Sequence, residues 1–192
     1  MRLVVLFDIY PCLRSVCHNL AFYTCTPCID QHTQIIPGLE ISEKPRSSWS
    51  AISAIVNSIL PTDLQLPEYL ECNSDIDFYG KPGIIIFDNA LYNHANEIEL
   101  ISSDLGIIPA WAKPFTPTEK AYQEGWNGRV KSEFLPSLPG FRGDPGLREG
   151  LKEGMASANM GLLAFKTSLM KWIYDVYSNQ PMSGGLTPRQ KW

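Results

Sequence analysis

The sequence predicts one α/β domain in which a mixed five-stranded sheet is flanked by helices. Three observations predict this class. Runs of apolar and β-branched residues follow one another closely over residues 1–42, the apolar period becomes that of a helix near residue 48, and a further apolar run at 83–88 stands between two helical segments. Closely spaced strands are typical of an antiparallel meander, whereas alternating strands and helices are typical of a sheet covered by helices.

Three strands are predicted in the first part of the chain. The run 3–9 (LVVLFDI) is apolar up to Asp8 and predicts a buried strand. The run 19–29 (NLAFYTCTPCI) is rich in aromatic, β-branched and Cys residues, and 34–42 (QIIPGLEIS) follows it. Pro27 predicts that the second strand is an edge or irregular strand, because proline cannot donate to a ladder.

A helix is predicted from Ser47 or Ser48 to about residue 60, because either serine can cap it and Pro61 stops it. Five apolar residues fall near one face of this helix: Ala51, Ile52, Ile55, Ile59 and Leu60. The polar, proline-bearing stretch 61–82 is expected to be a connection.

A central strand is predicted at 83–88 (GIIIFD), where a continuous apolar run ends in Asp88 and indicates burial on both faces. A helix over 94–105, closed by Gly106, and a short strand over 107–112 are expected to follow.

Two longer helices complete the prediction. The segment 118–133 is expected to be helical although Gly125 and Gly128 each weaken it by about 1 kcal/mol relative to alanine. Pro and Gly residues predict a loop over 135–150, and an amphipathic helix follows over 158–178. Its apolar stripe comprises Leu162, Phe165, Leu169, Trp172, Ile173 and Val176. A short helical turn is expected after Thr187-Pro188.

Composition excludes several classes of protein. With 44% apolar and 19% charged residues the chain is typical of a globular domain, and no apolar run approaches the 18 residues of a membrane span. The opening MRLVVLFDIY is interrupted too early by Asp8 to be a secretory signal. We therefore expect reduced thiols in a cytosolic compartment at Cys12, Cys17, Cys25, Cys28 and Cys72. The net charge of −4 indicates that other domains would supply most of any affinity for nucleic acid.

Two of the apolar runs end in a carboxylate, Asp8 and Asp88. If these strands are neighbours, the two side chains emerge close together, and their repulsion favours a cation between them. Converging carboxylates with open positions suit Mg²⁺. Glu124 is the third candidate, since 35 residues separate it from Asp88 and leave room for a helix, a strand and a return. Asp30, in CIDQHTQ, also follows an apolar strand and is an alternative first carboxylate.

The stretches FDNALYNH (87–94) and KAYQEGWNG (120–128) resemble the second and third catalytic motifs of the retroviral integrase superfamily, and above all of phage Mu-type transposases. Asp88-Asn89 matches the family's Asp-Asn-Gly. Four residues match its Pro-x-x-Lys-x-x-x-Glu-Arg-x-x-Gly: Pro117, Lys120, Glu124 and Gly128. The resemblance extends through GKPGIIIF (80–87), 29–48 and 178–188, and so covers nearly the whole chain. Three positions depart from the pattern: Leu6 replaces Trp, Ala90 replaces Gly, and Gly125 replaces Arg.

The resemblance implies a ribonuclease H-like fold and the catalytic core of a DDE-type transposase or integrase. It implies that Asp8, Asp88 and Glu124 are catalytic and hold two Mg²⁺ (or Mn²⁺) ions for nicking and joining DNA. Asp8 is preferred over Asp30 because the ligand closes the first strand in this family. Lys120, Lys131 and Asn89 are candidate DNA contacts. The two lysines fall on a similar helical face around Glu124, and solvated helix charges are the alternative interpretation for them.

Residues 1–134 would be the ribonuclease H-like core, and 135–192 a loop and helix extending the same domain. The implied partners are transposon ends and target DNA, with the chain as a homo-oligomer on that DNA and no membrane. The implied compartment is the bacterial cytoplasm, at the nucleoid, for a bacterial or phage element. Two alternatives stay open: a ribonuclease H-like nuclease that does not join strands, and a decayed or regulatory relative that does not cut.

A zinc site is a further alternative, because Cys25-x-x-Cys28 lies near Cys17, His18 and His32. The spacing fits no common zinc finger and the motif falls inside a predicted strand. Buried thiols that act as small apolar side chains are therefore the preferred interpretation.

Overall fold

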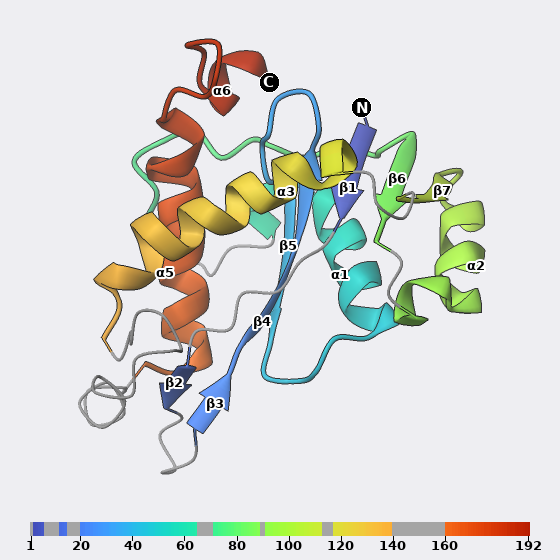
Figure 1. The fold of residues 1–192 in the computed structure, drawn as a ribbon, viewed down its shortest axis with the longest axis horizontal. Coiled ribbons are helices and arrows are strands. Elements are labelled where there is room, and N and C mark those ends of the chain that lie inside the picture. Colours follow the sequence, from blue (N-terminus) through green and yellow to red (C-terminus); the bar gives the residue numbers. More distant parts are fainter. Residues whose placement is uncertain are drawn as a thin grey trace.

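Within the described residues, five strands form one sheet in the order β5-β4-β1-β6-β7 (Figure 1). The computed structural model describes residues 2–5, 12–14, 20–64, 71–88, 91–112, 117–139 and 160–192. The strands are β1 (Arg2–Val5), β4 (Thr24–Asp30), β5 (Gly38–Ser42), β6 (Ile84–Phe87) and β7 (Ile108–Trp111). The pairs β1–β4 and β4–β5 are antiparallel, while β6 runs parallel to both β1 and β7. The α/β class and the early meander are therefore as predicted.

The predicted strand over 19–29 is divided at Tyr23. Its first part, β3 (Leu20–Phe22), pairs with β2 (Cys12–Arg14) in a separate hairpin that the sequence reading missed. Tyr23 is fully buried, and its ring stacks on Phe165 at 5.1 Å between centroids. One of the aromatic residues that suggested a single continuous strand, Tyr23, thus packs against a helix that is distant in the sequence.

Pro27 does not mark an edge strand. It pairs with Leu39 of β5, and β4 lies between β5 and β1 in the sheet. The prediction of an edge strand was therefore wrong. The described pairing of β4 with β1 covers Cys28 to Asp30, so Pro27 lies just outside it, and no described residue of β1 needs the amide hydrogen that proline lacks.

The strand β6 is less buried than predicted. Ile85 and Phe87 are buried, but the alternate residues Ile84 and Ile86 are only partly buried. One face of β6 packs in the core with the helices α1 (Ser48–Ile59) and α2 (Asn96–Asp104). The continuous apolar run therefore predicted the strand correctly, but only one of its two faces is fully buried.

Helix α1 lies unusually close to β5. A β-carbon at Gly38 would meet the Ala54 carbonyl oxygen at 2.3 Å and the Ser58 amide nitrogen at 2.5 Å. Only glycine therefore permits this approach, which buries Ala51 and Ile55. The helix begins as predicted, because the Ser47 amide donates to Ser50 Oγ at 3.1 Å. At the other end, Leu60 is 41% exposed rather than part of the buried face.

The other face of the sheet is covered by α3 (Pro117–Arg129) and α5 (Leu162–Asp175) (Figure 1). Helix α3 continues into a π-helical turn, Val130–Phe134, and a 3₁₀ turn, Leu135–Ser137. Phe134 packs between Phe165 and Trp172 of α5, with ring centroids 5.9 and 5.6 Å apart. Of the stripe predicted for α5, Val176 is an exception at 40% exposed, because the helix ends at Asp175.

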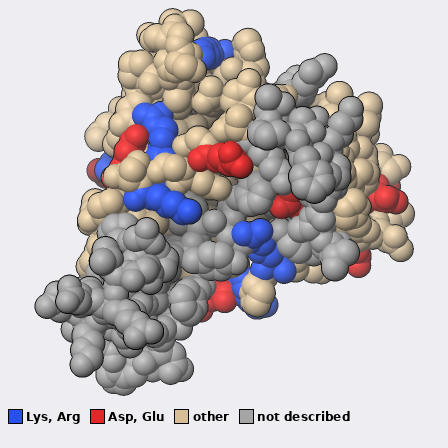
Figure 2. Space-filling model, in the orientation of Figure 1, with Lys and Arg blue, Asp and Glu red and all other residues tan. Residues whose placement is uncertain are grey.

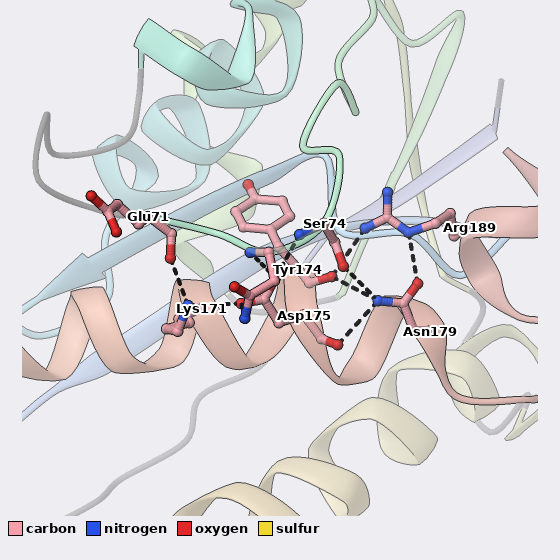
Figure 3. A network of polar contacts seen from close by, with 8 residues as sticks. Glu71, Ser74, Lys171, Tyr174, Asp175, Asn179 and Arg189 are labelled. Carbon is pink, nitrogen blue, oxygen red and sulfur yellow. Dashed lines mark hydrogen bonds and ion pairs between the residues drawn. The ribbon is translucent and has the colours of Figure 1, made fainter.

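A polar network fastens the segment that leads toward β6 onto α5 (Figure 3). The Asp175 carboxylate accepts hydrogen bonds from the amides of Asn73 (2.8 Å) and Ser74 (3.0 Å) and from Lys171 Nζ (2.9 Å). Burial alone would raise the pKa of Asp175, but these hydrogen bonds outweigh it and hold the pKa below its ordinary value.

Arg189 joins the C-terminal helix α6 (Pro188–Lys191) to the same network (Figure 3). It donates to Asn179 Oδ1 at 2.8 Å and to the Tyr174 carbonyl at 3.0 Å, and its guanidinium lies 4.8 Å from the centre of the Phe78 ring. The expected turn after Thr187 is therefore present, and it packs on the domain. Over the described ranges, the structure contains no helix with the length and apolar character needed to cross a bilayer.

Candidate functional site

The carboxyl ends of three parallel strands meet at one edge of the sheet. Val4 of β1 pairs with Ile86 of β6, and Phe87 of β6 pairs with Trp111 of β7. Asp88 directly follows β6 at this edge. Asp8 comes three residues after the last residue of β1 and lies outside the described residues. The two strands that lead to the predicted carboxylates are thus parallel neighbours, as the sequence reading required.

Asp88 is a buried carboxylate with a dedicated donor. Its side chain and backbone together are 8% exposed, and its Oδ1 accepts a short hydrogen bond from Asn93 Nδ2. The same Asn93 nitrogen also lies 3.5 Å from the Asp88 carbonyl oxygen. Asn93 is completely buried and belongs to the 3₁₀ turn Leu91–His94. Because a buried carboxylate needs donors, this amide stabilises the position of Asp88.

Trp111 holds Asn93 from the neighbouring strand. Its Nε1 donates to the Asn93 carbonyl oxygen at 3.0 Å. The Trp111 ring stacks on His94 at 5.2 Å and lies 6.2 Å from Phe87, between ring centroids. The ends of β6 and β7 and the turn after β6 are therefore joined through one indole ring.

Asp30 is placed for a different task. Its Oδ2 accepts hydrogen bonds from the Thr33 amide (2.9 Å) and the Thr33 hydroxyl (2.7 Å), which closes the turn after β4. Asp30 pairs with Leu3, and Leu3 pairs with Ile85, three residues before Asp88. Strand geometry then separates Asp30 from Asp88 by roughly 10 Å in the direction of the strands, which is three residues, and by roughly 10 Å perpendicular to them, which is two strand spacings. That spacing is too large for one shared cation.

A cavity of about 700 Å³ adjoins this turn, with Asp30, His32, Tyr122 and Trp192 among its lining residues. Its described lining includes neither Asp88 nor Glu124. Its described lining also includes no residue of β6 or β7.

Glu124 lies on α3 with an exposed side chain, and Lys131 is exposed further along the same helix. The inward face of this helix is formed by Gln123, Trp126 and Val130, which are buried. Lys120 also belongs to α3, but its side chain lies outside the description, as does all of Asn89. Among the described residues, no three His, Cys, Asp or Glu side chains form a group that could hold a metal. Asp8 does not fall within that set.

The Cys25 and Cys28 thiols are free and buried on opposite faces of β4. Cys25 packs in the core cluster with Tyr23, and Cys28 packs in the cluster with Ile85. Burial raises the pKa of both thiols. The two sulfurs cannot converge on one zinc ion, so their role as small apolar side chains is confirmed.

Sequence reasoning missed Asn93 and Trp111. It named Asn89, the residue next to Asp88, as a candidate DNA contact. A second asparagine four residues further along the chain and an aromatic residue at the end of the next strand were available signals. Neither signal was decisive, because the pairing of β6 with β7 is needed to bring Trp111 over Asn93.

Solved retroviral integrases share the fold of this chain. A chain of the simian T-cell lymphotropic virus intasome, solved in complex with PP2A regulatory subunit B56 gamma, aligns with a TM-score of 0.57 and 16% identity. The alignment covers 99% of this chain and 53% of that one, so this chain spans about half the length of its neighbour. The HTLV-2 integrase catalytic core domain in complex with magnesium, in its trimeric form, aligns with a TM-score of 0.50 and 15% identity, over 99% of this chain and 94% of that one. The dimeric form of the same domain aligns with a TM-score of 0.51 and 14% identity, over 99% of this chain and 93% of that one.

The fold is thus the ribonuclease H-like α/β fold, and the protein is a domain of the transposase and integrase type. No curated protein matches the sequence. The pattern of the TnsB C-terminal domain family matches residues 12–140. The chain belongs to that family.

Proposed function

We propose that this chain is the catalytic core of a DNA transposase, in which the five strands form the sheet of a ribonuclease H-like active domain. Asp8, Asp88 and Glu124 are its catalytic carboxylates. The observation that supports this best is the parallel pairing of β1 with β6. Because the two strands are parallel neighbours, the chain leaves both of them at the same edge of the sheet on its way to Asp8 and Asp88. Family membership and the integrase-like fold support the same proposal.

The described part of the site fits a divalent cation. Asp88 offers a buried carboxylate at the strand edge, and its described donor, Asn93, is a neutral amide. Oxygen ligands of this kind are those that Mg²⁺ and Mn²⁺ accept. Two such cations, held by Asp8, Asp88 and Glu124, would stabilise the charge that develops during in-line displacement at phosphorus.

The protein's own residues position the reactants. Water attacks the phosphodiester in the nicking step, and the released 3′-hydroxyl attacks target DNA in the joining step, so no protein nucleophile is required. Lys120 on α3 and Lys131 in the π-helical turn that continues it flank Glu124 in sequence and would contact DNA phosphates, and Asn89 would contact DNA beside Asp88. On the face that α3 crosses, Figure 2 shows acidic side chains near the centre and Lys and Arg side chains on both sides of them.

The partners follow from the same proposal. Transposon ends and target DNA are the substrates, and the chain acts as a homo-oligomer on them within the bacterial cytoplasm. The net charge of −4 requires that other parts of the assembly supply most of the DNA affinity.

The test uses supercoiled plasmid and a labelled oligonucleotide with a free 3′-hydroxyl, incubated with the chain and Mg²⁺ or Mn²⁺. Relaxed plasmid without label reports nicking, and label on the plasmid reports joining. Asp88→Asn and Glu124→Gln should each lower both products by about 10²-fold or more, because each removes a charge that stabilises the transition state. Glu97→Gln, in the first turn of α2, is the matched control and should retain both.

Each other outcome identifies a competing function. Nicking without joining indicates a nuclease of the same fold. DNA binding with neither product, under both metals, indicates a regulatory relative that does not cut, and it would overturn the proposal.

A further inference from the structure

We propose that Asn93 is a positioning residue that orients the Asp88 carboxylate toward its cation, and that Trp111 fixes Asn93 for this purpose. The inference rests on the proposed function, because it assigns to Asn93 a role at the same site. It adds two residues to that site that are absent from the motifs Asp-Asn-Gly and Lys-x-x-x-Glu.

The contact between Asn93 and Asp88 has one consistent chemical assignment. The carboxylate accepts hydrogen bonds, so the group that faces Asp88 Oδ1 is the amide nitrogen of Asn93, and the reverse orientation would place two acceptors together. The nitrogen thereby fixes one oxygen of the carboxylate and restrains its rotation. The remaining lone pairs of Asp88 keep a defined direction, as second-shell hydrogen bonds do at other metal sites.

The cost of this amide indicates that it serves the site. Asn93 is completely buried, and its Oδ1 finds no hydrogen-bond partner in the part of the chain that the structure describes. An apolar side chain of the same size would avoid that desolvation penalty and would fill the same volume. What it could not provide is the donor to Asp88.

A neutral donor suits a carboxylate that binds a cation. A lysine or arginine in the same place would also satisfy the buried Asp88, but its charge would repel the metal and compete with it. The asparagine orients the carboxylate without bringing a positive charge of its own. This property distinguishes Asn93 from Lys171, whose ammonium group pairs with Asp175 in the structural network at α5.

Trp111 makes the arrangement rigid. The Asn93 carbonyl accepts from Trp111 Nε1, and the indole ring is itself held by stacking on His94 and by Phe87. Trp111, at the end of β7, therefore fixes the position of the turn after β6. Small displacements of this turn would move the Asp88 carboxylate directly.

The experiment measures thermal unfolding of the whole chain as Mn²⁺ is titrated, which reads metal binding without any catalytic turnover. Asn93→Leu should raise the Mn²⁺ concentration for half-maximal stabilisation by about 10–100-fold, the range expected for loss of a second-shell donor. Asn57→Leu is the matched control: the Asn57 amide donates to the Leu39 carbonyl at 2.9 Å, between α1 and β5. The control should lower the metal-free melting temperature and leave the Mn²⁺ midpoint unchanged.

Trp111→Phe tests the second half of the proposal and also serves if Asn93→Leu does not fold. It keeps an aromatic ring beside His94 and Phe87 but removes the donor to Asn93, so the Mn²⁺ midpoint should rise in the same direction, by less. An unchanged midpoint in the folded variants, while Asp88→Asn abolishes stabilisation, overturns the role of Asn93 and leaves the proposed function standing. No stabilisation of the wild-type chain by Mn²⁺ contradicts the proposed function itself, and the inference fails with it.

Discussion

Replacing Gly38 by alanine should destabilise the domain strongly, because it inserts a methyl group where α1 lies on β5. The new β-carbon would stand 2.3 Å from the Ala54 carbonyl oxygen, 2.5 Å from the Ser58 amide nitrogen and 2.8 Å from Ser58 Cβ. Two of these three atoms belong to the helix backbone, so no side-chain rotation relieves the overlap. The helix must move away from the sheet by roughly 1 Å, which loosens the close packing of Ala51 and Ile55.

The expected cost is about 3 kcal/mol, the upper end of the range measured for overpacked cores. For a chain of 192 residues, this corresponds to a fall in melting temperature of roughly 6–12 °C. Circular dichroism during heating, or calorimetry, would measure it. Gly125→Ala is the contrasting variant, because nothing lies within 4 Å of the added carbon and the site is exposed on α3. It should stabilise the chain by about 1 kcal/mol through helix propensity. A fall of less than roughly 2 °C for Gly38→Ala would refute the close approach of α1 to β5, given the scale of about 2–4 °C per kcal/mol.

Three further changes have defined outcomes. Asp175→Asn should lower the melting temperature at neutral pH, and the difference from wild type should shrink as the pH falls below about 4. The folded chain holds the pKa of Asp175 below its ordinary value of 3.8, so the ionised carboxylate stabilises the fold at higher pH and loses this effect when it is protonated. A pH-independent difference would contradict this. Arg189→Ala should release α6, seen as faster tryptic cleavage at Lys191, and Arg189→Lys should not restore protection, since lysine cannot make the same forked contacts and ring stacking. Cys25 and Cys28 should resist thiol reagents in the native chain and react only on unfolding, because both are buried; rapid modification of either, measured by mass spectrometry, would show that β4 is not in the core.

Much of the fold follows from local sequence signals. The helix from Ser48 to Ile59 has its capping serine and its stopping proline in place, and the apolar run at 84–87 is a strand. These features depend on short-range chemistry, which periodicity reports well. The hairpin of β2 with β3 was missed, because Tyr23 divides the strand through a contact with Phe165 in a distant part of the chain.

The candidate site was predictable only in outline. Apolar runs that end in Asp8 and Asp88 were evident in the sequence, and the sheet order shows that β1 and β6, the strands described within these runs, are neighbours. The environment of Asp88 was not predictable, because Trp111 meets Asn93 only through the pairing of β6 and β7. Asp30 illustrates the converse, since its place after an apolar strand suggested a ligand although its carboxylate closes a turn with Thr33.

The central claim is that Asp8 and Asp88 share divalent cations at the edge where β1 and β6 end. Its most direct test is a crystal of the chain soaked in Mn²⁺, with the metal located by its anomalous scattering. The claim predicts a peak within roughly 2 Å of carboxylate oxygens from both Asp8 and Asp88. A structure in which Asp8 points away from Asp88, with no peak beside either, would contradict it.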